Sequence, residues 1–150
     1  MSLIGIARLF LFVRELPNNT GQRVEAIQKW SGGKPGDSWC AFFVSLCLDL
    51  RDQGECPLPC TGSCDAILEM AKSKGWVTTN PLPGDLYLFV RNGSDAYHVG
   101  IVTDVSGRGT FRGISGNTSA DGLSANGDRV AERILNLDPG KHVFVTVPRP

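Results

Sequence analysis

Apolar and polar positions change their period halfway along the chain, from that of helices to that of strands. In the first half, four segments predict helices, at residues 3–16, 22–30, about 39–50 and about 63–74. The second segment shows the pattern well, because Val24, Ile27 and Trp30 share one face of a helix. Gly75 follows the fourth segment and is typical of a helix C-terminus.

After residue 85 the apolar segments are shorter, and five of them predict strands: residues 86–90, 98–105, 109–114, 129–135 and 142–147. The tight connection SGRG joins the second strand to the third, which predicts that these two pair antiparallel. Helices followed by an antiparallel sheet are typical of an α+β domain. We therefore expect N-terminal helices packed on a C-terminal antiparallel β-sheet, with a long polar loop at residues 115–128.

The bulk composition fits an ordinary globular domain. With 150 residues and a mass of 16.2 kDa, the chain is long enough for a single core, so we assign residues 1–150 to one domain. Fifteen basic and fifteen acidic residues cancel. This balance gives no electrostatic reason to expect nucleic acid or an anionic membrane surface as a partner.

The apolar N-terminus predicts neither a membrane span nor an export segment. Residues 3–13, LIGIARLFLFV, are interrupted by Arg8, whereas a helix needs about 20 apolar residues to cross a bilayer. Arg14, Glu15 and Pro17 follow it in place of the small residues of a signal-peptide cleavage site. We expect neither membrane insertion nor a signal peptide. Without an export signal, the odd count of five cysteines argues for at least one free thiol.

Cys40 is the thiol whose surroundings most suggest chemistry. It lies in GDSWCAFFVSLCL, residues 36–48, between a turn and an apolar helix. If Asp37 or Ser38 caps that helix, Cys40 falls in its first turn, where unpaired backbone N–H groups and the helix dipole favour a thiolate. The same N–H groups would help to hold an oxyanion. The pattern fits a nucleophile, and it also fits a buried cysteine that only packs.

A cysteine nucleophile needs a base, and the chain has two histidines, His98 and His142. His98 begins a predicted strand, and Gly100 on the same face leaves space beside its ring. His142 lies in the last strand and is less well placed. A third group should orient the imidazole, and Asn117 at the end of the next strand is placed to accept its other N–H. Taken alone, His98 also fits a structural histidine, and GNTS a polar turn.

Four segments in this order resemble one family. GDSWCAFFVSLCL, PLPGDLYLF, YHVGIV and ISGNTS…DGLSANGDRVAERI look like the cysteine, histidine-dependent amidohydrolase/peptidase (CHAP) family of papain-like, NlpC-like cell-wall hydrolases. The resemblance covers about residues 14–135 and implies a papain-like fold. It implies that Cys40 is the nucleophile, His98 the general base and acid, and Asn117 the third residue. Ser115 stands where many members have glutamate, so this chain either relies on Asn117 or is a weaker enzyme.

The resemblance implies acyl transfer to water. The Cys40 thiolate attacks an amide carbonyl, His98 protonates the leaving amine, and water then hydrolyses the thioester with His98 as base. The implied substrate is an amide of peptidoglycan, either a stem-peptide bond or the N-acetylmuramoyl-L-alanine link, and no metal or cofactor is required.

The same resemblance suggests where such an enzyme works. We expect a monomer made in a bacterial or phage-infected cytoplasm that acts at the cell wall after non-classical release. A phage lysin, an antibacterial effector with an immunity protein as partner, and a wall-remodelling enzyme all fit the sequence. A cytosolic small-molecule amidase of the same fold is an alternative.

Three further cysteines leave another alternative open. Cys56, Cys60 and Cys64 are spaced four apart in CPLPCTGSC. The spacing suggests a metal site or a reversible disulfide, although the prolines and the glycine break any helix there. A non-enzymatic redox or binding module that uses this loop therefore remains possible.

Three residues near these motifs have plainer interpretations. Cys47 comes seven residues after Cys40 on the same apolar helix, which predicts a core residue. Trp39 fits the edge of the core, and it also fits a platform that stacks on substrate. Asp85 in PGDL predicts a turn residue that precedes the first strand and takes no part in catalysis.

Overall fold

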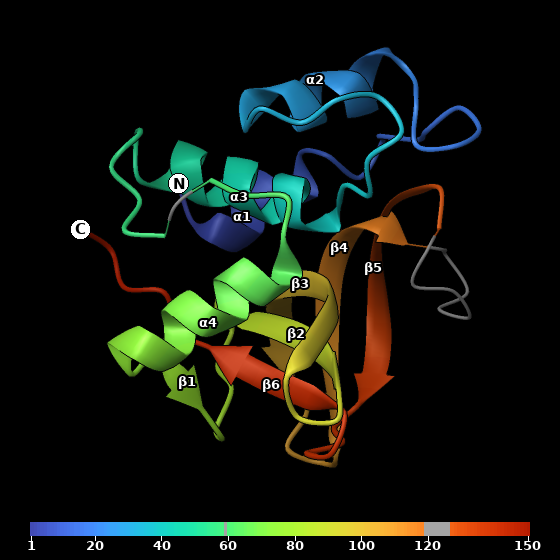
Figure 1. Ribbon diagram of the computed structural model, residues 1–150. Coiled ribbons are helices and arrows are strands. Elements are labelled where there is room, and N and C mark those ends of the chain that lie inside the picture. Colours follow the sequence, from blue (N-terminus) through green and yellow to red (C-terminus); the bar gives the residue numbers. More distant parts are fainter. Residues whose placement is uncertain (59, 119–126) are drawn as a thin grey trace.

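The computed structural model describes residues 1–58, 60–118 and 127–150, in which helices come first and strands follow, as the sequence predicts (Figure 1). The helices are α1 (Leu3–Arg8), α2 (Gln22–Trp30), α3 (Cys40–Arg51) and α4 (Cys64–Lys74). The strands are β1 (Val77–Thr78), β2 (Leu86–Arg91), β3 (Asp95–Val105), β4 (Thr110–Thr118), β5 (Arg129–Asn136) and β6 (His142–Val145). The α+β prediction is therefore confirmed.

The described strands form one antiparallel sheet in the order β1-β6-β2-β3-β4-β5. β3 and β4 pair across the SGRG connection, as predicted, with Ile101 opposite Ile114. The two strands are longer than predicted at one end. β3 begins at Asp95, and β4 continues to Thr118 because its pairing with β5 resumes after a register shift that begins at Ser115.

The first helix is much shorter than the predicted segment 3–16. α1 ends at Arg8, and the chain turns through residues 9–12. After this turn the backbone satisfies its hydrogen bonds on the sheet, since the carbonyl of Val13 accepts from the N–H of Val130 on β5 (3.1 Å). β5 is the last strand of the sheet, and an uncovered edge strand is a site of unwanted pairing. The N-terminal segment therefore covers the edge of β5 instead of extending the helix.

α3 forms the centre of the core. Its residues Cys40–Leu48 are all buried, so it is enclosed on every side rather than amphipathic. α1 and α2 pack against it, and so do β3 and β4 of the sheet (Figure 1). Ser45 is a polar residue in this apolar run, and its Oγ donates to the Thr61 carbonyl (2.9 Å) and accepts from the Thr61 N–H (3.0 Å). This pair of hydrogen bonds fixes the loop before α4 to α3.

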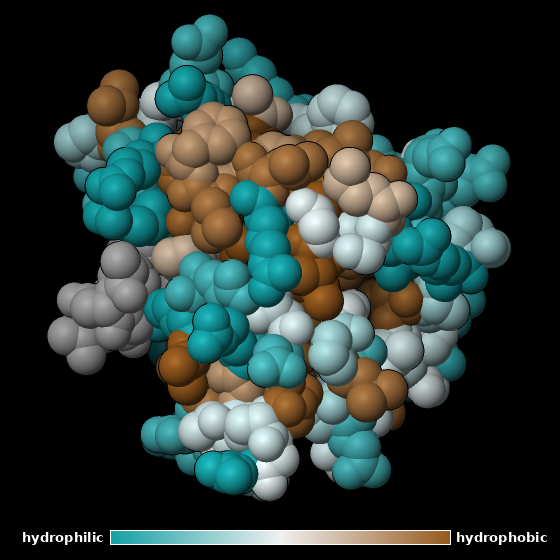
Figure 2. Space-filling view, turned by 180° about the vertical axis from the view of Figure 1, so that it is seen from behind, coloured by the Kyte–Doolittle hydropathy of each residue, from teal (hydrophilic) through white to brown (hydrophobic). Residues whose placement is uncertain are grey.

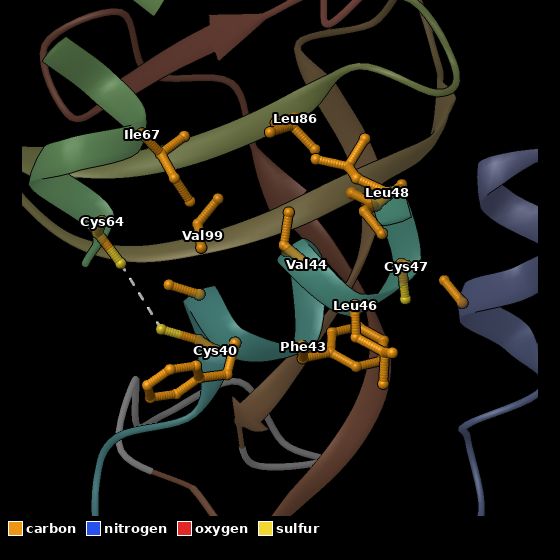
Figure 3. Packing of buried hydrophobic residues seen from close by; sticks show 14 of the residues in the cluster. Cys40, Phe43, Val44, Leu46, Cys47, Leu48, Cys64, Ile67, Leu86 and Val99 are labelled. Carbon is orange, nitrogen blue, oxygen red and sulfur yellow. Dashed lines mark hydrogen bonds between the residues drawn. The ribbon is translucent and has the colours of Figure 1, made fainter. Parts of the chain in front are cut away.

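The sheet is apolar on both faces. The face toward the helices carries Leu86 and Val99, which Figure 3 shows close to α3 and α4. The opposite face carries a second cluster, made of Tyr87, Val102, Phe111 and Phe144. His98 belongs to this second face, because Gly100, two residues along β3, lies opposite Tyr87.

Glycine is required where two loops close over the Phe42 ring. A Cβ at Gly33 or at Gly62 would overlap that ring. We expect Gly62→Ala to lower the free energy of unfolding by about 1–3 kcal/mol, since the loop or the ring must move to make room. Urea denaturation measures the change. Gly140→Ala is the matched control, because its new methyl group meets only a flexible Asp138 side chain, and equal stability of the two variants would contradict the prediction.

The back of the molecule carries exposed apolar surface. Figure 2 shows apolar residues gathered in the upper part of this view. A groove of about 350 Å³ lies among aromatic and aliphatic residues of the N-terminal segment, α2 and α3, including Phe10, Phe12, Trp30 and Leu50. Within the described residues, no helix combines the length and the apolar character needed to cross a lipid bilayer.

Candidate active site

Cys40 is the first residue of α3, in the first turn as predicted, but the predicted cap is wrong. The N-cap is Trp39, whereas the Asp37 carboxylate accepts from the Lys34 N–H (3.0 Å). Asp37 therefore closes the preceding turn, a usual role for aspartate, and neither it nor Ser38 caps the helix. Because the Trp39 side chain makes no capping hydrogen bond, the first-turn N–H groups beside Cys40 favour a negative charge there.

Trp39 fixes the start of α3 between two distant parts of the chain. It is fully buried, and its Nε1 donates to Glu15 Oε2 (2.8 Å). Gly116 on β4 lies against the indole, where a Cβ would come within 2.6 Å of the ring. A side chain with no exposed surface has no face for a substrate. Trp39 is thus a core residue, and the stacking alternative is wrong.

His98 lies on β3 with a fully buried side chain. Its Nε2 is 3.0 Å from Ser115 Oγ. Its Nδ1 is buried and makes no hydrogen bond within the described residues. The predicted space beside the ring is filled, because the Tyr87 ring packs across Gly100, and the Phe89 ring lies 5.1 Å from the imidazole between centroids. The ring nitrogen that remains for a thiol is Nδ1.

The structure brings Cys40 and His98 together at the start of α3. Hydrogen bonding with Cys64 (Sγ–Sγ 3.7 Å, Figure 3) lowers the pKa of the Cys40 thiol most. The neighbouring His98 imidazole and the backbone of Val99 lower it further, and together they outweigh burial, which raises it. The hydrogen bond with Cys40 and burial raise the pKa of Cys64. The two shifts favour a negative charge on Cys40 and the proton on Cys64. The site places a thiol with a lowered pKa beside an imidazole.

Ser115 lies against the imidazole at the position where the sequence predicts Asn117. Ser115 is fully buried on β4. Asn117 follows two residues later, buried, with a φ of 51° inside the register shift of the strand. Asparagine adopts this left-handed conformation more readily than most residues. The role of Asn117 as the orienting group stays a prediction, and Ser115 becomes a second candidate for that role.

The contacts of three other residues singled out in the sequence indicate structural roles. His142 Nδ1 accepts from the Asp138 N–H (3.2 Å), and burial lowers the pKa of this histidine. Cys47 is fully buried in the core, as predicted, and burial raises the pKa of its thiol. Asp85 Oδ2 accepts from the Leu82 N–H (2.8 Å), which makes it the predicted turn residue before β2.

The cysteines of the CPLPCTGSC segment do not share one environment. Cys64 begins α4 and contacts Cys40, whereas Cys60 is exposed. Cys56 is half-buried, and burial raises its pKa to about 11. All five cysteines are free thiols. In the part of the chain that the structure describes, no group of three or more histidine, cysteine or acidic side chains is arranged to hold a metal ion.

Two buried polar residues behind Ser115 escaped the sequence analysis. Burial raises the pKa of Tyr87, while the nearby Ser115 hydroxyl and the charge of Arg133 lower it. Arg133 is 7% exposed, and its Nε and Nη2 make no hydrogen bond within the described residues. The signal that could have found Tyr87 is the pair Gly100 and Gly113, since a Cβ at either would overlap its ring. These two side chains extend the polar group behind His98.

The chain was compared with known protein families and with curated proteins. The family model described as the CHAP domain matches residues 30–117. That segment includes Cys40, His98, Ser115 and Asn117. Comparison with curated proteins gives no match.

Proposed function

Because the chain belongs to the CHAP family, and thus to the amidase and peptidase class of hydrolases, we propose that it is a cysteine hydrolase of peptidoglycan. The family's papain-like fold accounts for the N-terminal helices and the antiparallel sheet. The observation that supports the cysteine mechanism is the position of Cys40 at the start of α3 beside the buried His98, where the pKa of its thiol is lowered. The substrate class follows from the family.

In the proposed reaction the electron pair of Cys40 Sγ forms a bond to an amide carbonyl carbon. First-turn N–H groups of α3 stabilise the resulting oxyanion. His98 Nδ1–H gives its proton to the amine as the C–N bond breaks, which leaves a thioester on Cys40. His98 then takes a proton from water, the hydroxide attacks the thioester, and the carboxylic acid leaves as the thiolate is restored.

Ser115 has a proposed role in this cycle, which a pair of variants tests. When His98 is protonated, its Nε2–H donates to Ser115 Oγ and the ring keeps Nδ1 toward Cys40. We expect Ser115→Ala to lower kcat/KM roughly tenfold, as the loss of one hydrogen bond of about 1.5 kcal/mol would. Asn117→Ala is the matched comparison. If it lowers kcat/KM and Ser115→Ala does not, the orienting group is Asn117 after all.

Mass spectrometry of digested peptidoglycan tests the function and names the bond. Purified walls of several cross-link chemistries are incubated with the protein, and the soluble fragments are sequenced. New amino termini within stem peptides would identify an endopeptidase, whereas glycan strands freed of whole stem peptides would identify an N-acetylmuramoyl-L-alanine amidase. Intact walls of every chemistry would overturn the proposed substrate class.

A further inference from the structure

We propose that Cys64 is a positioning residue for the hydrolase, whose S–H group holds the Cys40 sulfur in place and keeps it ionised. Its meaning for catalysis rests on the proposed function, but the interaction itself does not. Cys64 would touch neither the substrate carbonyl nor the leaving amine. It would act through Cys40.

The two sulfur atoms face one another in a buried site. Figure 3 shows the Cys40 side chain, from the start of α3, and the Cys64 side chain, from the start of α4, pointing toward each other. Their Sγ atoms are 3.7 Å apart, and the residues are 5% and 8% exposed. A buried thiolate loses most of its hydration, so it depends on donors supplied by the protein. Cys64 Sγ lies close enough to Cys40 Sγ to be such a donor.

Cys64 is held in position by its neighbours on both sides. Ser63 Oγ accepts from the Ala66 N–H (3.1 Å) and caps α4. Asp65 Oδ1 accepts from the Ala96 N–H on β3 (2.7 Å), two residues before His98. The preceding loop is fixed to α3 by Ser45 and Thr61. The first turn of α4 is therefore attached to both elements that carry the proposed nucleophile and base.

The surroundings of the two thiols decide which one keeps its proton. Two buried thiols in contact cannot both ionise at neutral pH, because the like charges would repel. Cys40 has His98 and the backbone of Val99 as partners that favour its anion. Cys64 has the negative Asp65 carboxylate beside it, which disfavours a second anion. The proton therefore stays on Cys64, directed at Cys40, and the pair carries a single negative charge.

The pH dependence of Cys40 alkylation tests this role without any substrate. Iodoacetamide reacts with the thiolate, and peptide mass spectrometry follows Cys40 separately from the other cysteines. We expect Cys64→Ala to move the midpoint of the Cys40 profile up by about one pH unit, and so to slow alkylation roughly tenfold below the midpoint. Cys64→Ser keeps a donor and is expected to hold the midpoint within about half a unit of the original.

The controls separate hydrogen bonding from packing. Cys60→Ser, which removes an exposed thiol, should leave the Cys40 midpoint unchanged. The proposal falls if Cys64→Ala leaves the midpoint unchanged, or if Cys64→Ser and Cys64→Ala shift it equally. Should the alanine variant fail to fold in circular dichroism, Cys64→Val and Cys64→Thr repeat the same comparison at larger, matched volume.

The outcome also stays distinct from that of the proposed function. A midpoint shift in a protein that cleaves no wall would support the Cys64 role and overturn the substrate. If the protein cleaves walls and its Cys40 midpoint is the same with and without Cys64, the proposed function is supported and the Cys64 role is overturned.

Discussion

Cys40→Ala is expected to lower the rate of peptidoglycan cleavage at least about a thousandfold while the chain keeps its fold. The reason is that the thioester route needs a sulfur nucleophile at the start of α3, which alanine does not supply. Fragment release measured by mass spectrometry gives the rate. Circular dichroism of the same sample shows whether the helices are retained.

Cys47→Ala is the matched control for this loss. It makes the same chemical change on the same buried helix, but outside the proposed site. We expect it to lower the free energy of unfolding through the small cavity it creates. At temperatures at which the variant stays folded, it should cleave walls as the unaltered protein does. Equal cleavage by the Cys40→Ala variant and the unaltered protein would mean that Cys40 is not the nucleophile.

His98→Gln is expected to have the second largest effect, a loss of about a thousandfold in kcat. Glutamine fills much of the same buried volume and can still bond Ser115, but it neither protonates the leaving amine nor activates water. The variant should also change the ionisation of the Cys40 thiol. Since His98 helps to lower the pKa of Cys40, its loss raises that pKa, and the midpoint of Cys40 alkylation moves to higher pH.

The sign of this pH effect follows from the direction of the shift. With the pKa of Cys40 below that of a free thiol, near 8.5, the unaltered protein keeps its thiolate as the pH falls below that value. The His98→Gln variant loses its thiolate at a higher pH. His142→Gln is the control, because His142 Nδ1 accepts a hydrogen bond from the Asp138 N–H. This variant should change neither kcat nor the midpoint of Cys40 alkylation. Matching losses in both histidine variants would mean that fold damage, not proton transfer, explains the effect.

Helices with a clear stripe were predictable from sequence, and the first segment was not. α2 has the predicted bounds because Val24 and Ile27 are buried on one face and Gly32 and Gly33 follow its end. In residues 3–16 the apolar residues are too dense to show which face is buried. Such a run fits a helix or an edge-covering strand equally, and the partner on β5 that decides between them lies far along the chain.

The site could be predicted as far as its motifs are local. The first-turn position of Cys40 follows from the turn that precedes an apolar helix. The contact of Ser115 with His98 depends on the pairing register of β3, β4 and β5, and a shift of one residue would exchange the faces. The contact of Cys64 with Cys40 depends on how a proline-containing loop folds over Phe42. Neither contact has a signature in the spacing of residues.

The N-terminal segment along β5 cannot reach its final position before β5 has been synthesised. During synthesis Val13 leaves the ribosome long before its partner Val130. Glu15 lies in the same segment and anchors Trp39, so the start of α3 waits for β5 as well. Contacts so far apart in sequence form slowly, because a long loop must close first. A nascent chain therefore carries an unfinished thiol site until β5 has been made.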